Sequence, residues 1–221
     1  WAGADRVAAT AARYGIKSVA IITYAPRWAQ DTNKPCATDQ HCPPLDPAVF
    51  ARFAGVAADR YKNTITTWEI WNEPNYKSFW SPTTNAASYA ALLKASYTAI
   101  KTANPNTTVL TGGLAAAADE GGNTSPTTFI RTLYTAGAKN HFDAVALHPY
   151  TYPMSPSYVA SWNSWQQVNG IRQLMIDQGD SAKKIWITEY GAPTGGPGVV
   201  RTLNSLTFAY GSDYVSESTQ Q

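Results

Sequence analysis

The chain has 221 residues, of which 44% are hydrophobic and 14% charged, and its formal net charge is +2. This composition predicts a folded, sparsely charged protein, and without a Lys/Arg cluster we expect no nucleic-acid partner. Apolar runs such as residues 19–22 are strand-sized at most, so we also expect no membrane span, which needs roughly 18 apolar residues. The chain begins at Trp1 rather than Met, so we expect it to be a segment of a longer precursor.

The N-terminal part alternates between predicted helices and strands. The first predicted helix has apolar residues on one face (Val7, Ala8, Ala11 and Tyr14). It ends at Gly15, because glycine readily adopts the left-handed backbone that ends a helix, and a strand is expected at 19–22. Asp46 and Pro47 then supply a cap and a first-turn proline for a second helix. That helix leads into a strand predicted at 68–73.

The same alternation continues to the C-terminus. Asn85 and Ser125 are predicted helix caps, and a last helix spans about 162–178, where Gly170 weakens the helical pattern. The strands that follow these three helices are expected at 108–113, 142–150 and 184–189.

Five strands alternating with helices predict the α/β class. Their apolar runs barely alternate, which is typical of parallel strands covered on both faces. Five units fit either an open doubly wound sheet or a barrel with strands missing, since a closed (β/α)8 barrel needs about 250 residues. Neither glycine pattern for phosphate binding occurs, which counts against a nucleotide-binding open sheet. No internal boundary is evident, so we expect one domain over 1–221.

Cys36 and Cys42 are the only cysteines and lie in a loop rich in Pro, Asp and Asn. We favour a disulfide between them, which in turn favours a secreted or extracytoplasmic protein. A zinc site with His41 has only three candidate ligands where structural zinc usually has four. Two free thiols are the third interpretation.

Two segments run an apolar stretch into a glutamate followed by turn residues. Glu73 lies in Trp-Glu-Ile-Trp-Asn-Glu-Pro-Asn (68–75), and Glu189 in Trp-Ile-Thr-Glu-Tyr-Gly (186–191), 189 − 73 = 116 residues later. Barrels place catalytic residues at strand ends, and two facing carboxylates can cleave a glycosidic bond, one protonating the leaving oxygen and the other attacking the sugar carbon. The alternative for each is a surface glutamate in a turn. Glu69 is expected in a buried hydrogen-bond network.

These two motifs closely resemble those of the retaining glycoside hydrolases of clan A, most nearly families 39 and 5. The resemblance implies a (β/α)8 TIM barrel of which this chain supplies strands 3 to 7, without strands 1, 2 and 8. It implies that Glu73 is the acid/base, Glu189 the nucleophile, and Asn72 the partner of the sugar 2-hydroxyl. Three βα units over 116 residues average about 39 residues each, an ordinary size for such a barrel.

Other residues at the predicted strand ends are candidates for substrate contact. In the clan, a histidine or tyrosine at the end of strand 6 often contacts the nucleophile or the sugar, which makes His148 and Tyr150 candidates; packing at the rim is their alternative. Tyr24, Trp28 and Trp71 are further candidates near strand ends. Other aromatic residues could stack on sugars, although ordinary packing is favoured for most of them (Tyr76, Trp80, Tyr152, Trp162 and Trp165).

Together these features predict a secreted, monomeric, retaining β-glycoside hydrolase acting on an oligosaccharide or polysaccharide, with endo action slightly favoured and no cofactor. No Gly-x-Ser-x-Gly elbow occurs, and a metal site built from Glu73, Glu189, His148 and Asp143 lacks supporting spacing. Two rivals remain: a carbohydrate-binding or scaffold protein without turnover, and a transglycosylase that uses the same glutamates.

Overall fold

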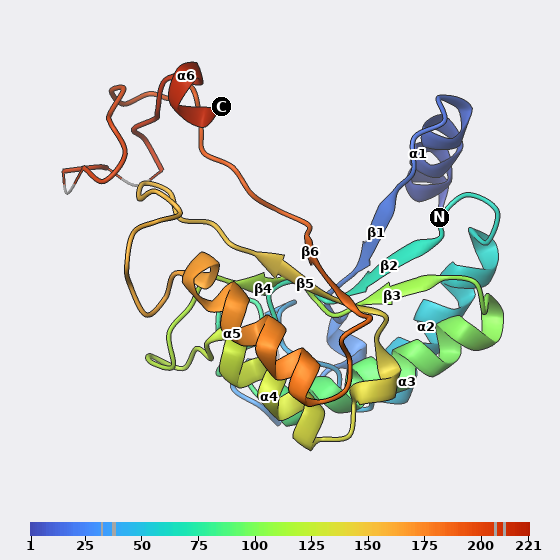
Figure 1. Ribbon diagram of the computed structural model, residues 1–221. Coiled ribbons are helices and arrows are strands. Elements are labelled where there is room, and N and C mark those ends of the chain that lie inside the picture. Colours follow the sequence, from blue (N-terminus) through green and yellow to red (C-terminus); the bar gives the residue numbers. More distant parts are fainter. Residues whose placement is uncertain (32, 37–38, 206, 210) are drawn as a thin grey trace.

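The computed structural model describes residues 1–31, 33–36, 39–205, 207–209 and 211–221. In this part of the chain one parallel sheet has the order β1-β2-β3-β5-β4, and β6 also pairs with β5 (Figure 1). The strands are β1 (Val19–Ile22), β2 (Thr67–Ile70), β3 (Thr108–Leu110), β4 (Leu114–Ala115), β5 (Ala144–His148) and β6 (Lys184–Ile187).

β3 and β4 are two pieces of one barrel strand. Leu110 pairs with Ala144 and Leu114 with Leu147, so four steps along β3–β4 face three along β5. This is a one-residue β-bulge. Thr111 spans it, because its backbone N–H donates to the carbonyl of Ala144 and its hydroxyl accepts from the N–H of Ala146. The five predicted barrel strands are therefore confirmed.

Helices cover the convex face of the sheet (Figure 1). They are α2 (Pro47–Arg60), α3 (Ala86–Ala103), α4 (Pro126–Thr135) and α5 (Ser164–Asp177), while α1 (Ala2–Arg13) precedes β1 and α6 (Glu217–Gln220) lies near the C-terminus. The predicted caps Asp46, Asn85 and Ser125 each accept a hydrogen bond from a first-turn N–H. α5 is continuous through Gly170.

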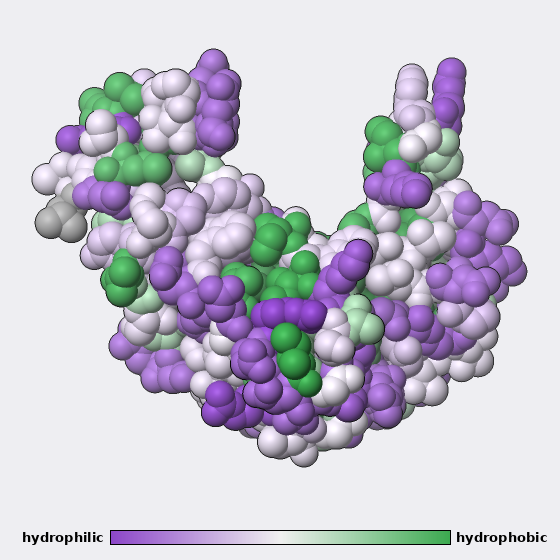
Figure 2. Space-filling view, viewed as in Figure 1, coloured by the Kyte–Doolittle hydropathy of each residue, from purple (hydrophilic) through white to green (hydrophobic). Residues whose placement is uncertain are grey.

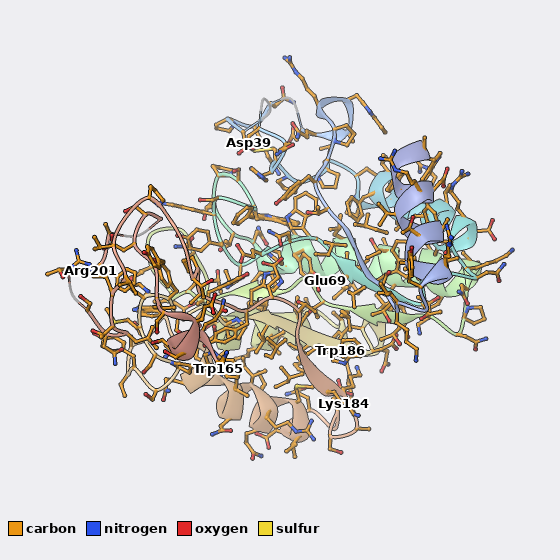
Figure 3. The ribbon with its side chains drawn as sticks, turned by 90° about the horizontal axis from the view of Figure 1, so that it is seen from above. Asp39, Glu69, Trp165, Lys184, Trp186 and Arg201 are labelled. Atoms are coloured by element: carbon orange, nitrogen blue, oxygen red, sulfur yellow. A yellow bond between two sulfur atoms is a disulfide. The ribbon has the colours of Figure 1, made fainter. Side chains whose placement is uncertain are left out.

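Side-chain alternation gives the sheet two different faces. Trp68 and Ile70 of β2 point into the main core beneath the helices, as do Val145 and Leu147 of β5. A second buried cluster holds Leu110, Ala144 and Ala146, with Trp186 packed against it. Figure 3 looks down on the open side, where Glu69 lies on β2 and Trp186 on β6. The concave face thus carries the residues that would line a barrel interior.

β1 and β6 end the sheet, so the barrel is incomplete, as predicted. Every residue of β5 is buried, whereas Ile187 of β6 and Val19 of β1 are each 42% exposed. Figure 2 shows the molecule hollowed between α1 and the C-terminal segment, above the sheet. Open strand edges of this kind are normally covered in a finished fold.

Three strands, β2, β5 and β6, end earlier than predicted. β2 ends at Ile70 rather than residue 73, because Trp71 and Glu73 have φ of 72° and 46° in the left-handed region. Non-glycine residues rarely adopt such values, and they cluster at functional sites. The left-handed backbone turns the chain at the point where the predicted acid/base lies.

Candidate active site

His148, the last residue of β5, lies among three glutamates. Its Nδ1 is 3.2 Å from Oε1 of Glu73, and its Nε2 is 3.5 Å from Oε1 of Glu69 and 3.6 Å from Oε1 of Glu189. The two glutamates of the sequence motifs, 116 residues apart (189 − 73), are therefore brought together around one imidazole.

The three carboxylates decide the charge of this histidine. Burial disfavours the imidazolium, but the neighbouring carboxylates of Glu69, Glu73 and Glu189 outweigh it and raise the pKa of His148 to about 9. His148 is therefore protonated at neutral pH. Among the residues described, no lysine or arginine forms an ion pair with these glutamates.

Glu69 is fully buried beneath this cluster. Its Oε1 accepts a 2.8 Å hydrogen bond from the N–H of Gly113, while its Oε2 has no hydrogen-bond partner among the described residues. The predicted buried hydrogen-bond network is confirmed for this residue. Since buried carboxylates are costly unless paired, the imidazolium of His148 is its main electrostatic support.

Two glycines at the β3–β4 bulge make room for this arrangement. A Cβ on Gly113 would lie 2.0 Å from Nε2 of His148, and one on Gly112 would lie 2.7 Å from the carbonyl oxygen of Ile70. Tyr89 of α3 ties the two strands together, because its hydroxyl donates to the carbonyl of Ile70 and accepts from the N–H of Gly112. Only glycine fits at these two positions.

Glu73 and Glu189 reach the cluster from opposite sides. Glu73 follows β2, its N–H donates to the carbonyl of Gly113, and its side chain is 14% exposed. Glu189 follows β6 and is more open, with a side chain 38% exposed. The hydroxyl of Tyr150 lies 3.4 Å from Oε2 of Glu189.

Asn72 and Tyr24 stand next to each other on the β1 and β2 side. The side-chain amide of Asn72 lies 3.4 Å from the hydroxyl of Tyr24. Burial raises the pKa of Tyr24, the hydrogen bond with Asn72 opposes the increase, and the charges of Glu73 and Glu189 add to it. The raised pKa keeps the Tyr24 hydroxyl protonated.

Trp71 does not lie where the sequence placed it. Trp71 is 0% exposed and its indole N–H donates to the carbonyl of Phe79, so it supports the rim from below and offers no face to a sugar. Its φ of 72° breaks the strand alternation and turns the ring into the core. Trp28, near the end of β1, is 78% exposed and lines an apolar cavity together with Tyr24 and Phe53.

An open cleft of about 550 Å³ extends from this cluster. Glu73, His148, Ala115 and Ala116 form its base. Its walls are aromatic: Tyr76, Phe79, Tyr150, Tyr152 and Trp162. Of the aromatics proposed from sequence, Trp80 is buried and Trp165 packs edge-on against Tyr190.

The disulfide between Cys36 and Cys42 is present, which excludes the zinc and free-thiol interpretations of this loop. The loop has a place in the site, because the ring of His41 packs edge-on between Tyr24 and Phe79, with centroid distances of 4.4 and 5.4 Å. It thus braces one wall of the cleft.

Glu73, His148 and Glu189 offer ligand atoms that all lie within 4.8 Å of one another, a spacing that could hold a metal ion. In this structure the imidazole of His148 lies between the carboxylates of Glu73 and Glu189 and contacts both. Asp143, the fourth residue of the metal hypothesis, instead pairs with Lys101 before the start of β5. It is not part of the site.

Sequence reasoning overlooked two supporting residues. Asn75 is fully buried and bonds the backbone of Ala115 through both side-chain atoms, which fixes β4 against the loop after β2. Phe79 lines the cleft six residues after Glu73, in a loop without regular structure. Asn75 is the last residue of the Asn-Glu-Pro-Asn motif, so its position in the sequence could have marked it as a candidate. No sequence pattern marks Phe79.

Within the part of the chain that the structure describes, no helix is both long and apolar enough to cross a bilayer. The comparison with curated proteins finds no significant match.

Solved structures with a similar fold include glycoside hydrolases. A family 39 glycoside hydrolase from Bacteroides cellulosilyticus WH2 is 25% identical over 86% of this chain and 39% of its own, with a TM-score of 0.62. A monomeric β-xylosidase from Caulobacter crescentus CB15 is 17% identical over 90% and 42%, with a TM-score of 0.65. A family 128 endo-β-1,3-glucanase from Sorangium cellulosum is 18% identical over 82% and 59%, with a TM-score of 0.51.

This chain thus spans about two-fifths of the length of the first two structures. The family model for glycosyl hydrolases family 39 matches residues 52–194, which include both Glu73 and Glu189. The matched range holds strands β2 to β6 and the whole charge cluster. The chain therefore belongs to glycosyl hydrolases family 39.

Proposed function

We propose that this chain carries the catalytic centre of a retaining β-glycoside hydrolase, with Glu73 as acid/base and Glu189 as nucleophile. One observation supports this most directly: an oxygen of Glu73 and an oxygen of Glu189 lie within 4.8 Å of each other. Retaining enzymes hold their two carboxyl groups about 5 to 5.5 Å apart, whereas inverting enzymes need about 6.5 to 9.5 Å to admit a water.

The reaction has two displacement steps. In the first, Glu73 gives its proton to the glycosidic oxygen as the carboxylate of Glu189 attacks the anomeric carbon, so the C–O bond breaks and the leaving sugar departs as an alcohol. In the second, Glu73 takes a proton from water, the resulting oxygen attacks the same carbon, and Glu189 is released. Two inversions give net retention.

Neighbouring groups have defined parts in this proposal. The imidazolium of His148 lies against both glutamates, so it offsets the negative charge that forms on Glu73 in the first step and on Glu189 in the second. The Tyr150 hydroxyl is placed to orient one oxygen of Glu189 and leave the other for attack. Asn72, with Tyr24 beside it, is the proposed partner of the sugar 2-hydroxyl.

The experiment that tests the proposal is a stereochemical one. NMR of the first product formed from a β-glycoside should show the β-anomer before mutarotation. An initial α-anomer would contradict the two-glutamate geometry. Mass mapping after reaction with an activated 2-deoxy-2-fluoro glycoside should place the covalent label on Glu189.

We also propose that residues 1–221 belong to one catalytic barrel domain, that the protein is a monomer, and that it works outside the cytoplasm on a β-linked oligosaccharide or polysaccharide. The disulfide supports the location, because such bonds persist in oxidising compartments. Alkylation of native protein from its own source followed by mass spectrometry should find neither Cys36 nor Cys42 modified. Modification of both would contradict the proposed location.

A further inference from the structure

Tyr24 is held in place by two neighbouring rings. Its hydroxyl accepts a hydrogen bond from the side-chain amide of Asn72, so its position matters to the site. Its φ of 65° is in the left-handed region, which a residue other than glycine keeps only where its surroundings fix it. Trp71 and His41 contact the Tyr24 ring edge-on, at centroid distances of 5.6 and 4.4 Å. The shorter of these contacts comes from the disulfide loop, the segment 36–42 that the disulfide closes.

The disulfide loop also holds the backbone that follows Tyr24. The N–H of Ala25 donates to the carbonyl of Gln40. The side-chain amide of buried Gln30 donates to the carbonyls of both Ala25 and Asp39 and so ties the two segments together. The loop therefore contacts the ring of Tyr24 and fixes the backbone next to it.

His41 is itself fixed by its own loop and by the loop after β2. Its Nδ1 lies 2.8 Å from Oδ1 of Asp39, and its backbone N–H donates to the same oxygen. Ser81, in the loop after β2, donates from its hydroxyl to Oδ2 of Asp39 and from its N–H to the carbonyl of His41. The disulfide links Cys42, which is fully buried, to Cys36. His41 thus lies where the loops after β1 and β2 meet (Asp39 is labelled in Figure 3).

Tyr24 in turn fixes the direction of the Asn72 amide. Among the residues that the structure describes, Tyr24 is the only hydrogen-bond partner of the Asn72 side chain. An amide offers two N–H donors and one carbonyl acceptor, so the N–H that Tyr24 holds determines where the other N–H and the oxygen point. These two groups are the ones available to a sugar hydroxyl.

We infer that His41 is a positioning residue for the proposed reaction, which holds the Tyr24 hydroxyl where it orients the amide of Asn72. It is not a catalytic residue, because it is not among the described residues that line the cleft at Glu73. It acts through Tyr24, and Tyr24 acts through Asn72. This inference rests on the proposed function, in which Asn72 is the partner of the sugar 2-hydroxyl.

Such a role has a kinetic signature that a purely structural role lacks. Hydrogen bonds to the sugar 2-hydroxyl strengthen in the transition state, so a misdirected Asn72 amide should lower kcat with little change in KM. The loss should also depend on the 2-hydroxyl, because a substrate without it has nothing for Asn72 to bind. A residue that only stabilises the fold would change the rates on both kinds of substrate alike.

The test compares 4-nitrophenyl β-glycosides of neutral hexoses and pentoses with the 2-deoxy counterpart of the one that wild-type protein hydrolyses best. In His41→Ala, we expect kcat for the parent glycoside to fall about 10-fold with KM changed less than about twofold, and kcat for the 2-deoxy glycoside to change less than about twofold. In an Asn72→Ala background, adding His41→Ala should cost less than about twofold, since both residues act on one contact. If wild-type protein does not hydrolyse the 2-deoxy glycoside, the double variant decides.

Two further variants control for packing. His41→Phe keeps a ring between Tyr24 and Phe79 and should retain kcat within about threefold of wild type. His141→Ala is the matched control, because His141 also packs edge-on against a tyrosine, Tyr97, at 5.7 Å, but precedes β5 and not a strand end that carries a glutamate. It should leave both rates unchanged. If circular dichroism shows that His41→Ala is misfolded, His41→Leu replaces it under the same criteria.

The results distinguish failure of this inference from failure of the proposed function. Equal losses on the parent and 2-deoxy substrates, losses that multiply in the double variant, or no loss in His41→Ala would overturn the positioning role and leave the two-glutamate mechanism intact. A His41→Phe variant as slow as His41→Ala would do the same. No turnover of any β-glycoside in the panel by wild-type protein would instead overturn the proposed function.

Discussion

Oε1 of Glu69 lies 3.5 Å from Nε2 of His148, and neither residue has any side-chain exposure. Glu69 is on β2 and His148 at the end of β5, so this buried pair joins two strands of the sheet directly below the proposed catalytic glutamates. Because the two side chains are in contact and shielded from water, the protonation of His148 depends on the charge of Glu69.

Replacing Glu69 should change the titration of His148. Glu69→Gln keeps an oxygen that can accept from Gly113 but removes the negative charge, so we expect the pKa of His148 to fall from about 9 toward its ordinary value of 6.5. NMR of ring-labelled protein can follow this, because the chain has only three histidines. A His148 titration identical to that of wild type would show that Glu69 does not support the imidazolium.

The same histidine predicts how stability depends on pH. Its pKa is raised on folding, so the imidazolium stabilises the native state fully below pH 6.5, and this contribution is lost as the pH rises through about 9. The loss is on the order of 3 kcal/mol at most. Urea unfolding at several pH values should show a decline over this window that is absent in His148→Gln. Parallel curves for the two proteins would contradict the assignment.

Substituting the two proposed catalytic residues should give different kinetic signatures. Glu189→Ala should lose activity on every substrate, by on the order of 10⁴-fold or more. Glu73→Ala should lose about 10² to 10⁴-fold on poor leaving groups, retain turnover of activated ones, and be rescued by azide. Steady-state rates on matched good and poor leaving groups are the measurement. Equal losses without rescue in both variants would refute the roles assigned here.

Gly113 should tolerate no side chain. Gly113→Ala would place a methyl carbon 2.0 Å from the His148 ring, so we expect a loss of about 3 kcal/mol in the free energy of unfolding. Gly170→Ala is the control, since it lies exposed inside α5 with open space around its Cα and should stabilise by about 0.5 to 1 kcal/mol. Chemical denaturation checks both; a neutral Gly113→Ala would mean that the ring moves freely.

Much of the fold could be predicted because its signals are local. Caps such as Asp46 and Asn85 have side chains that serve helix N-termini wherever they occur, and each begins a helix here. The pairing of Glu73 with Glu189 across the rim also followed from motif and strand order. The caps depend on a few neighbouring residues, and the pairing of the two glutamates depends on the order of strands in the barrel.

The orientation of Trp71 and the surroundings of His148 could not be predicted, because they depend on backbone conformation and long-range contacts that no sequence pattern indicates. Trp71 was expected to face a sugar, yet a left-handed φ turns it into the core. A tryptophan gives no indication of a left-handed backbone, which glycine adopts far more often. His148 was a candidate, but its position between three carboxylates depends on the contact with Glu69, which no spacing rule encodes.

The bulge between β3 and β4 decides which side chain lies beside His148 at the rim. β2 and β3 keep one register from Thr67 opposite Thr108 to Asn72 opposite Gly113, so the extra residue is taken up only against β5. His148 consequently lies opposite Ala115 instead of residue 114. The single extra residue in β3–β4 therefore decides that the small side chain of Ala115, and not that of Leu114, lies beside the imidazole where the cleft begins.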